Sequence, residues 1–368
     1  LHVTALPKRA LMDARFGFSR LGKLNARAQR ARPHLLDADL VLAHNAPCNW
    51  MLGSIKLPGQ RAWQCNEPPR TLHLRKANPR LAARVDATPG GTVDLATRSV
   101  RKVMQVGSER QKQLHKRVLS DIAMTQQLDT VFAISQFSRD NARAIYGHCE
   151  EQVVYPFVRF PEGGTRQGRI GPDGLQILVQ TRLAPKKNVD SVIRGFAEYR
   201  KGDPRATLHV VGDGPLREHL QELAQELMPP DACLIHGYLS TQELREVYDR
   251  CQVFVLLTID EPFGMVYPEA AARGLLIIGP DHGGPLEILE GGELGHCIDP
   301  FESEALVQAL DELRTLSTDE VARRRRGADR SCRARFGQEA VTADLLQVLG
   351  LKAQTHPRTA TYPLGRYR

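Results

Sequence analysis

Short apolar runs alternate with amphipathic helical patterns through the second half of the chain. The expected strands are 175–179, 208–211, 233–235, 253–257 and 275–278, and the expected helices are 188–199, 215–227, 241–249 and 263–272. Each strand is a continuous apolar run, as in strands that are buried on both faces of a parallel sheet. The alternation therefore predicts an α/β domain built from strand–helix units.

The first half of the chain repeats this pattern less regularly. Its expected strands are 2–5, 40–43, 61–65, 130–134 and 152–155, and its expected helices are 10–30, 100–124 and 138–146. A polar, glycine-rich segment at 161–168 is suited to an interdomain linker. We therefore predict an N-terminal domain at 1–160, a C-terminal domain at 161–336, and a last helix with a loose tail at 337–368.

Composition narrows the class of protein. Of the 368 residues, 42% are hydrophobic and 25% are charged, which is typical of a soluble globular protein. No apolar run reaches the roughly 18–20 residues that cross a bilayer, and the first residues have no signal-peptide pattern. The seven cysteines include no C-x-x-C pair, so we expect reduced thiols and a cytoplasmic setting.

The formal net charge of +8 indicates anionic partners. No nucleic-acid-binding motif is present, so we expect no nucleic-acid partner. Segment 8–32 carries many Lys and Arg residues with Asp13 as its one acidic residue, in the pattern of a basic amphipathic helix. Such a helix suits peripheral contact with an anionic inner membrane face. The alternative, a helix packed on the N-terminal sheet with a basic outer face, stays open.

Three predicted turns at the carboxyl ends of C-terminal strands are suited to an anionic ligand, which in parallel sheets binds at this edge. The first turn carries Arg182 and Lys187 just before a helix, where cations are unfavourable unless an anion lies between them. The second holds Gly212 and Gly214, which we interpret as a tight turn that lines the site, with Pro215 at the first helical position. Ordinary surface cations and an ordinary turn are the alternatives.

The third turn, at 260–269, combines acidic residues with a glycine. Gly264 leaves the free N–H groups of the predicted helix start accessible to a diphosphate. Glu269, almost two helical turns further along, is expected to accept hydrogen bonds from a ribose diol. Glu261 precedes the helix and is expected to lie nearer the reacting sugar. A solvated helix face is the alternative explanation of two glutamates at this spacing.

The segment Glu-Pro-Phe-Gly-Met-Val-Tyr-Pro-Glu at 261–269 resembles the E-x₇-E signature of retaining GT-B glycosyltransferases of family four. Other motifs of this chain fall in the order of that family, at 39–44, 65–70, 133–137, 153–156, 182–188, 212–216, 236–238 and 281–287. The resemblance covers nearly the whole chain. It implies two Rossmann-like domains that face each other across a cleft.

The resemblance also implies roles for individual residues. Arg182 and Lys187 would bind the donor diphosphate and Glu269 the ribose, while Glu261 would position the donor sugar. The further residues implied to line the donor or acceptor side are Phe263, Gly264, Met265, Val266, Gly212, Gly214, Asn66 and His44. The resemblance implies no bound metal, because members of this architecture need none, and no cofactor is expected, since the UDP- or GDP-hexose donor is a substrate.

Two departures from the family bear on the acceptor side. Strand 2–5 corresponds to the third strand of the family, so we expect an N-terminal domain without the first strand and its glycine-rich loop. Asn66 occupies a position that is commonly His, and an amide can donate a hydrogen bond but cannot transfer a proton. Both departures concern catalysis more than donor binding.

The leading hypothesis is an enzyme, a retaining glycosyltransferase that moves a hexose, with mannose as one candidate, to a glycan or lipid-linked acceptor of a cell-surface polysaccharide. Two alternatives stay open. One is a non-catalytic subunit that binds a sugar nucleotide, and the other is a sugar-nucleotide epimerase of the same fold.

Overall fold

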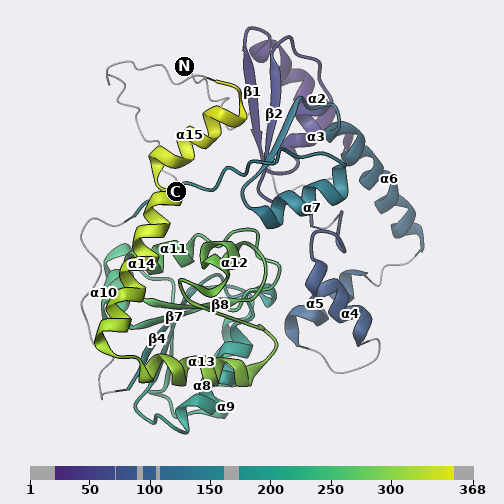
Figure 1. Cartoon of the computed structure of the whole chain (residues 1–368). Coiled ribbons are helices and arrows are strands. Elements are labelled where there is room, and N and C mark those ends of the chain that lie inside the picture. The colour runs from purple at the N-terminus through teal and green to yellow at the C-terminus, as the bar shows by residue number, and fades with distance from the viewer. Residues whose placement is uncertain (1–20, 71, 89–93, 105–107, 161–173, 352–368) are drawn as a thin grey trace.

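The computed structural model describes residues 21–70, 72–88, 94–104, 108–160 and 174–351. The protein has an α/β fold with two parallel sheets, each covered by helices (Figure 1). The predicted strand 2–5, the first half of helix 10–30, the linker 161–168 and the tail beyond residue 351 lie outside the described residues.

The N-terminal sheet has three described strands in the order β1-β2-β3, and both pairs are parallel. The strands are β1 (Leu40–His44), β2 (Gln60–Cys65) and β3 (Thr130–Ala133). The helices around it are α2 (Leu21–Ala31), η2 (Arg32–Leu35), α3 (Cys48–Gly53), α4 (Pro79–Ala87), α5 (Leu95–Met104), α6 (Ser108–Thr125) and α7 (Gln136–Tyr146). The core of this domain includes Trp63 and Tyr146, whose rings meet edge to face at 5.6 Å.

Helix α2 bears on the hypothesis of a membrane-seeking basic helix. Its apolar side chains Leu24 and Ala28 are buried in the N-terminal core, at 6% and 1% exposure. The described part of the helix therefore packs as an ordinary amphipathic helix. The remainder of segment 8–32, up to residue 20, lies outside the described residues.

One of the N-terminal predictions was wrong. Segment 152–155 is not a strand: Val154 is buried and donates one hydrogen bond to Ala133, but no ladder forms. The helix predicted at 100–124 falls on two described helices, α5 and α6, and residues 105–107 between them lie outside the described residues.

The C-terminal sheet has six strands in the order β6-β5-β4-β7-β8-β9, all parallel. They are β4 (Gln176–Gln180), β5 (Thr207–Val211), β6 (Cys233–Gly237), β7 (Val253–Val255), β8 (Leu276–Pro280) and β9 (His296–Ile298). The strand order reverses between β4 and β7, and ligands of open parallel sheets bind at the carboxyl ends of the strands at such a switch point.

The helices of this half are η3 (Pro185–Lys187), α8 (Val189–Arg200), α9 (Arg217–Leu227), α10 (Thr241–Arg250), α11 (Val266–Ala272), α12 (Gly284–Ile288), η4 (Glu290–Gly292), α13 (Ser303–Thr315), α14 (Thr318–Phe336) and α15 (Gln338–Val348). The predicted strands and most helices agree with these bounds. Two helices start later than predicted, α9 at Arg217 rather than Pro215, and α11 at Val266 rather than residue 263.

The chain returns to the N-terminal domain at its end. Helix α14 runs along the C-terminal domain and α15 then packs on the N-terminal sheet, as Figure 1 shows. The contact is apolar: Leu349 joins Ala62, Phe132 and Val154 in one buried cluster. The two domains are therefore connected twice, by the segment after β3 and by α14–α15. Among the described residues, no helix has the length and apolarity needed to cross a membrane.

Candidate functional site

The turns after β4 and β7 meet because these two strands are neighbours in the sheet. Lys187 lies in η3 after β4, and Glu261 lies in the turn after β7. The Lys187 Nζ is 2.6 Å from Glu261 Oε2, and both side chains are partly buried, at 28% and 18% exposure. The structure thus brings together two of the three residues predicted to be catalytic.

The third, Arg182, is held mainly by its backbone neighbours. A Cβ on Gly212 would lie 1.8 Å from the Thr181 carbonyl oxygen, and one on Gly214 would lie 2.4 Å from the Leu183 oxygen. Only glycine allows this close approach, so the two glycines let the turn after β5 pack directly on the backbone on either side of Arg182. Their role is to position Arg182. The Arg182 side chain is exposed, and it makes no hydrogen bond or ion pair to the described residues.

The turn before α11 presents backbone donors. Gly264 has φ 91°, and a Cβ there would lie 2.6 Å from the Tyr267 ring, which explains the glycine. Within the described part of the chain, the N–H groups of Phe263, Gly264 and Met265 donate no hydrogen bond. They are available to a ligand at the edge of the sheet. Phe263 itself is buried, while the Met265 side chain is 41% exposed and Val266 begins the helix.

Glu269 is closer to this turn than the sequence predicts. Because α11 begins at Val266, Glu269 lies in its first turn rather than almost two turns further in. Burial raises the pKa of Glu269, and the nearby Arg273 opposes that rise. The carboxylate accepts no hydrogen bond from any described residue. A half-buried acceptor in this state is suited to a ligand that brings its own hydroxyl donors.

The N-terminal domain contributes a loop that follows β2. Arg70 donates a hydrogen bond through Nη2 to the Asp260 carbonyl oxygen at 2.9 Å, and it pairs through Nε with Glu67. Burial raises the pKa of the Glu67 carboxyl, the Arg70 charge opposes this, and the charge of Glu261 adds to the rise. In this loop only Asn66 was predicted as a site residue, whereas Glu67 and Arg70 were noted only as part of the motif at 65–70. The charged pair three residues apart, after a predicted strand, was the available signal.

The two residues predicted on the acceptor side occupy the same edge of the N-terminal sheet. Asn66 follows β2, and its carbonyl oxygen accepts a hydrogen bond from Ser138 Oγ at 2.7 Å. His44 ends the neighbouring strand β1 and is exposed. Partial burial lowers the pKa of His44, while a hydrogen bond with Gln64 opposes the shift.

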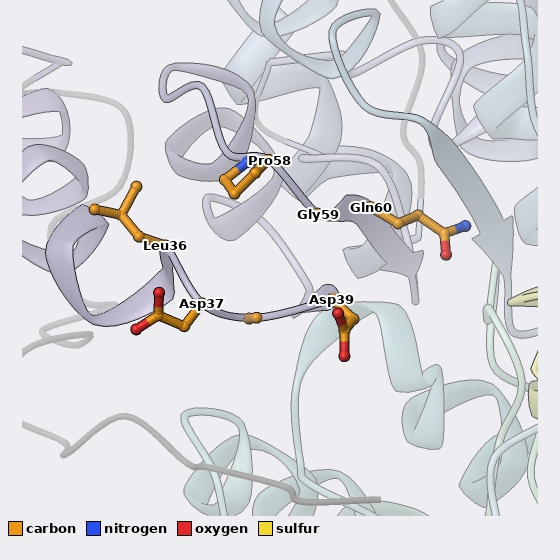
Figure 2. A pocket seen from close by; sticks show the side chains of 7 residues that line it. Leu36, Asp37, Asp39, Pro58, Gly59 and Gln60 are labelled. Atoms are coloured by element: carbon orange, nitrogen blue, oxygen red, sulfur yellow. The ribbon is translucent and has the colours of Figure 1, made fainter.

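A separate shallow pocket lies at the opposite edge of the N-terminal sheet. Figure 2 shows its lining from the turns that precede β1 and β2, including Asp37, Asp39, Pro58 and Gln60. Two carboxylates on an open rim repel an anionic ligand. This pocket is therefore a poor site for a diphosphate, and it lies away from Lys187 and Glu261. Among the described residues, no group of three or more His, Cys, Asp or Glu side chains is arranged to hold a metal ion.

Comparisons with solved structures define the class of fold. A sucrose-phosphate synthase from Thermosynechococcus elongatus superposes with a TM-score of 0.67 at 17% identity, over 94% of this chain and 80% of that one. HepE from Anabaena, in complex with UDP and glucose, gives a TM-score of 0.63 at 17% identity, over 90% and 83% of the two chains. The predicted GT-B architecture, the two-domain fold of these proteins, is confirmed.

Sequence comparisons are more specific for the C-terminal half. Residues 165–330 match the model of the family described as "Glycosyl transferases group 1". Mannosylfructose-phosphate synthase of Agrobacterium fabrum is 32% identical over 188 residues, 49% of this chain and 41% of that protein. The GDP-mannose-dependent alpha-(1-6)-phosphatidylinositol monomannoside mannosyltransferase of Mycolicibacterium smegmatis is 27% identical, over 50% and 53%. The chain thus matches about half the length of these curated relatives.

Proposed function

We propose that the protein is a retaining glycosyltransferase of family four that transfers a hexose from a UDP- or GDP-sugar to a glycan or lipid-linked acceptor. The observation that carries the proposal is the Lys187–Glu261 pair at the switch point of the C-terminal sheet, next to the free N–H groups of 263–265. Glycosyl transfer needs an anion site of this kind, because negative charge develops on the departing diphosphate.

Each donor-side residue has a task in this reaction. Lys187 and Arg182 offset the charge on the diphosphate as the bond to the sugar breaks. The N–H groups of Phe263, Gly264 and Met265 bind phosphate oxygens, and the Glu269 carboxylate accepts hydrogen bonds from the ribose. Glu261 fixes Lys187 and positions the sugar. The acceptor hydroxyl attacks on the face that the diphosphate leaves, so the anomeric configuration is kept. The reaction is proposed to need no metal and no further cofactor.

The acceptor side is proposed to bind an anionic molecule. Residues 1–160 contain 25 Lys or Arg and 12 Asp or Glu, whereas residues 161–368 contain 25 and 30. A basic domain attracts a phosphorylated or lipid-linked acceptor, or an anionic inner membrane face that carries one. Mannose is the favoured hexose, since two similar proteins are named for mannosyl transfer or synthesis.

A thermal-shift screen with UDP, GDP and their hexose conjugates tests this function. Binding at 100 times the dissociation constant adds about 2.7 kcal/mol to the stability, which is readily measured. Transfer then requires release of the nucleoside diphosphate with an acceptor present. No stabilisation by any of these nucleotides would contradict the proposal.

Two alternatives give different results in the same screen. A non-catalytic subunit, which Asn66 favours because it cannot transfer a proton, would be stabilised by a nucleotide but release none. An epimerase would convert the sugar nucleotide into its epimer without an acceptor.

A further inference from the structure

Two helices of the N-terminal domain begin against carboxylates of the C-terminal domain. Asp260 accepts hydrogen bonds from the N–H groups of Arg80 and Leu81 at the start of α4, both at 3.1 Å. Glu287 accepts hydrogen bonds from Gln136 and Phe137 at the start of α7, both at 2.9 Å. The first N–H groups of a helix need such acceptors, which normally come from the helix's own cap residue.

Helix α4 does not obtain this cap from its own sequence. Its N-cap residue, Asn78, makes no capping hydrogen bond. The Asn78 amide donates to the Leu74 carbonyl oxygen, and its Oδ1 accepts from Lys186 Nζ at 2.6 Å. The cap comes instead from Asp260, nearly two hundred residues further along the chain and in the other domain.

Asp260 is bound on every side. Its side chain is fully buried, and its backbone has φ 51°, in the left-handed region. Its N–H donates to His282 Nε2 at 3.1 Å, and its carbonyl oxygen accepts from Arg70. A buried carboxylate with two N–H partners is costly to disturb. The next residue in the chain is Glu261, so this arrangement fixes the start of the turn at 260–265, which we call the donor turn.

Helices α4 and α5 also contact the residue before Asp260 and the short helix η3, which carries Lys187. Figure 1 shows them away from the N-terminal sheet, on the side of the C-terminal domain. Leu81, Ala96 and Val100 form a buried cluster with Ile259, the residue before Asp260. The Ile259 N–H donates to the Lys186 carbonyl oxygen at 3.0 Å, and α5 packs on η3, which carries Lys187.

We propose that Asp260 is a positioning residue that makes the donor site depend on both domains: by capping α4 it fixes the turns that carry Glu261 and Lys187. The proposal rests on the proposed function for the role of those two residues. Glu287 supplies a comparison, because its carboxylate also meets the start of an N-terminal helix, although α7 has a cap of its own in Ser135. Helix α12, which carries Glu287, touches the turn of Glu261 through its backbone, where the Gly284 N–H donates to the Glu261 carbonyl oxygen.

The test uses Asp260→Gly and Asp260→Asn in the full chain, with Glu287→Ala as the control. Glycine removes the carboxylate without backbone strain, since it adopts a positive φ freely. Asparagine tolerates this φ and keeps one acceptor oxygen. Hydrogen–deuterium exchange is measured at 79–88 and 258–265, and UDP and GDP affinities are measured by calorimetry.

We expect Asp260→Gly to raise exchange in both segments and to weaken nucleotide binding by roughly tenfold or more. Asp260→Asn should recover part of that loss. Glu287→Ala should raise exchange at 135–147 and change nucleotide affinity less than about twofold.

Equal losses of affinity in Asp260→Gly and Glu287→Ala would overturn the proposal, since Asp260 would then serve only to join the domains. Raised hydrogen–deuterium exchange at 79–88 with unchanged exchange at 258–265 would also overturn the proposal. Loss of the cap on α4 would then leave the donor turn unchanged. If the wild-type chain binds neither nucleotide, the proposed function fails separately, and the exchange at 258–265 still decides the role of Asp260.

Discussion

The two domains differ in how their functional residues reach the site. In the C-terminal domain, Lys187, Glu261 and Glu269 lie on turns and a helix start that directly follow neighbouring strands, so the sheet brings them together. In the N-terminal domain, Glu67 and Arg70 lie on a loop whose position depends on contacts with the opposite domain. The groups proposed to bind the donor therefore come from one sheet, while the loop after β2 and the contacts of Asp260 join that sheet to the other domain.

Replacing Lys187 should have the largest effect. Lys187→Ala removes the cation that faces the developing diphosphate charge and leaves Glu261 without its partner, so we expect turnover to fall by roughly 10²- to 10³-fold. The measurement is steady-state release of the nucleoside diphosphate. Lys201→Ala is the control, because Lys201 pairs with Glu198 on the surface of α8. A loss of the same size in both variants would mean that Lys187 has no special role.

Glu269 tests donor binding alone. Glu269→Gln should weaken UDP or GDP binding by roughly tenfold to a hundredfold, because an amide accepts ribose hydrogen bonds less strongly than a carboxylate. Burial raises the pKa of Glu269, so the wild-type affinity should begin to fall at a higher pH than for an exposed glutamate. Calorimetry across acidic pH measures both effects. An affinity that does not change with pH in the wild type would contradict this role.

A histidine pair in the C-terminal sheet tests the stability of that domain. His209 on β5 is buried and lies 3.0 Å from His236, and burial lowers its pKa to about 4. In the unfolded chain the His209 side chain binds a proton below pH about 6.5, whereas in the folded protein it does so only below about 4. The free energy of unfolding is therefore unaffected by this group above pH about 6.5, and it falls as the pH decreases toward 4.

We expect a loss of about 2 kcal/mol at pH 5 from this group, measured by urea unfolding. His209→Gln should make that part of the pH profile flat, and a variant profile identical to the wild type would contradict the assignment.

Asn66 gives the smallest expected effect and separates the two sides of the site. Asn66→His restores a group that can transfer a proton, so turnover should rise by up to about tenfold. Nucleotide affinity should stay the same, because residue 66 lies on the N-terminal domain. A change in nucleotide affinity without a change in turnover would place Asn66 on the donor side. The proposed division of roles between the two domains would then be wrong.

The sequence predicted most of the C-terminal domain because its apolar runs and helical periods agree everywhere with one parallel sheet. The turn at 260–269 and the cations at 182 and 187 were also predicted from the sequence, since glycines and charged residues follow the ends of strands there. The start of α11 was placed too early, because Gly264 and the residues before it suit either a turn or a helix start. The distance from Glu269 to the turn was wrong for that reason.

The pattern of residues determined the fold class, the donor turns and the kinds of group that they carry. Only the tertiary structure decided that Lys187 pairs with Glu261, that Arg70 reaches Asp260, and that Asp260 caps α4. Local sequence specifies strands and helices through interactions between near neighbours. These contacts join residues from about 70 to 190 positions apart. The C-terminal sheet brings Lys187 to Glu261, and the packing of the two domains brings Arg70 and α4 to Asp260.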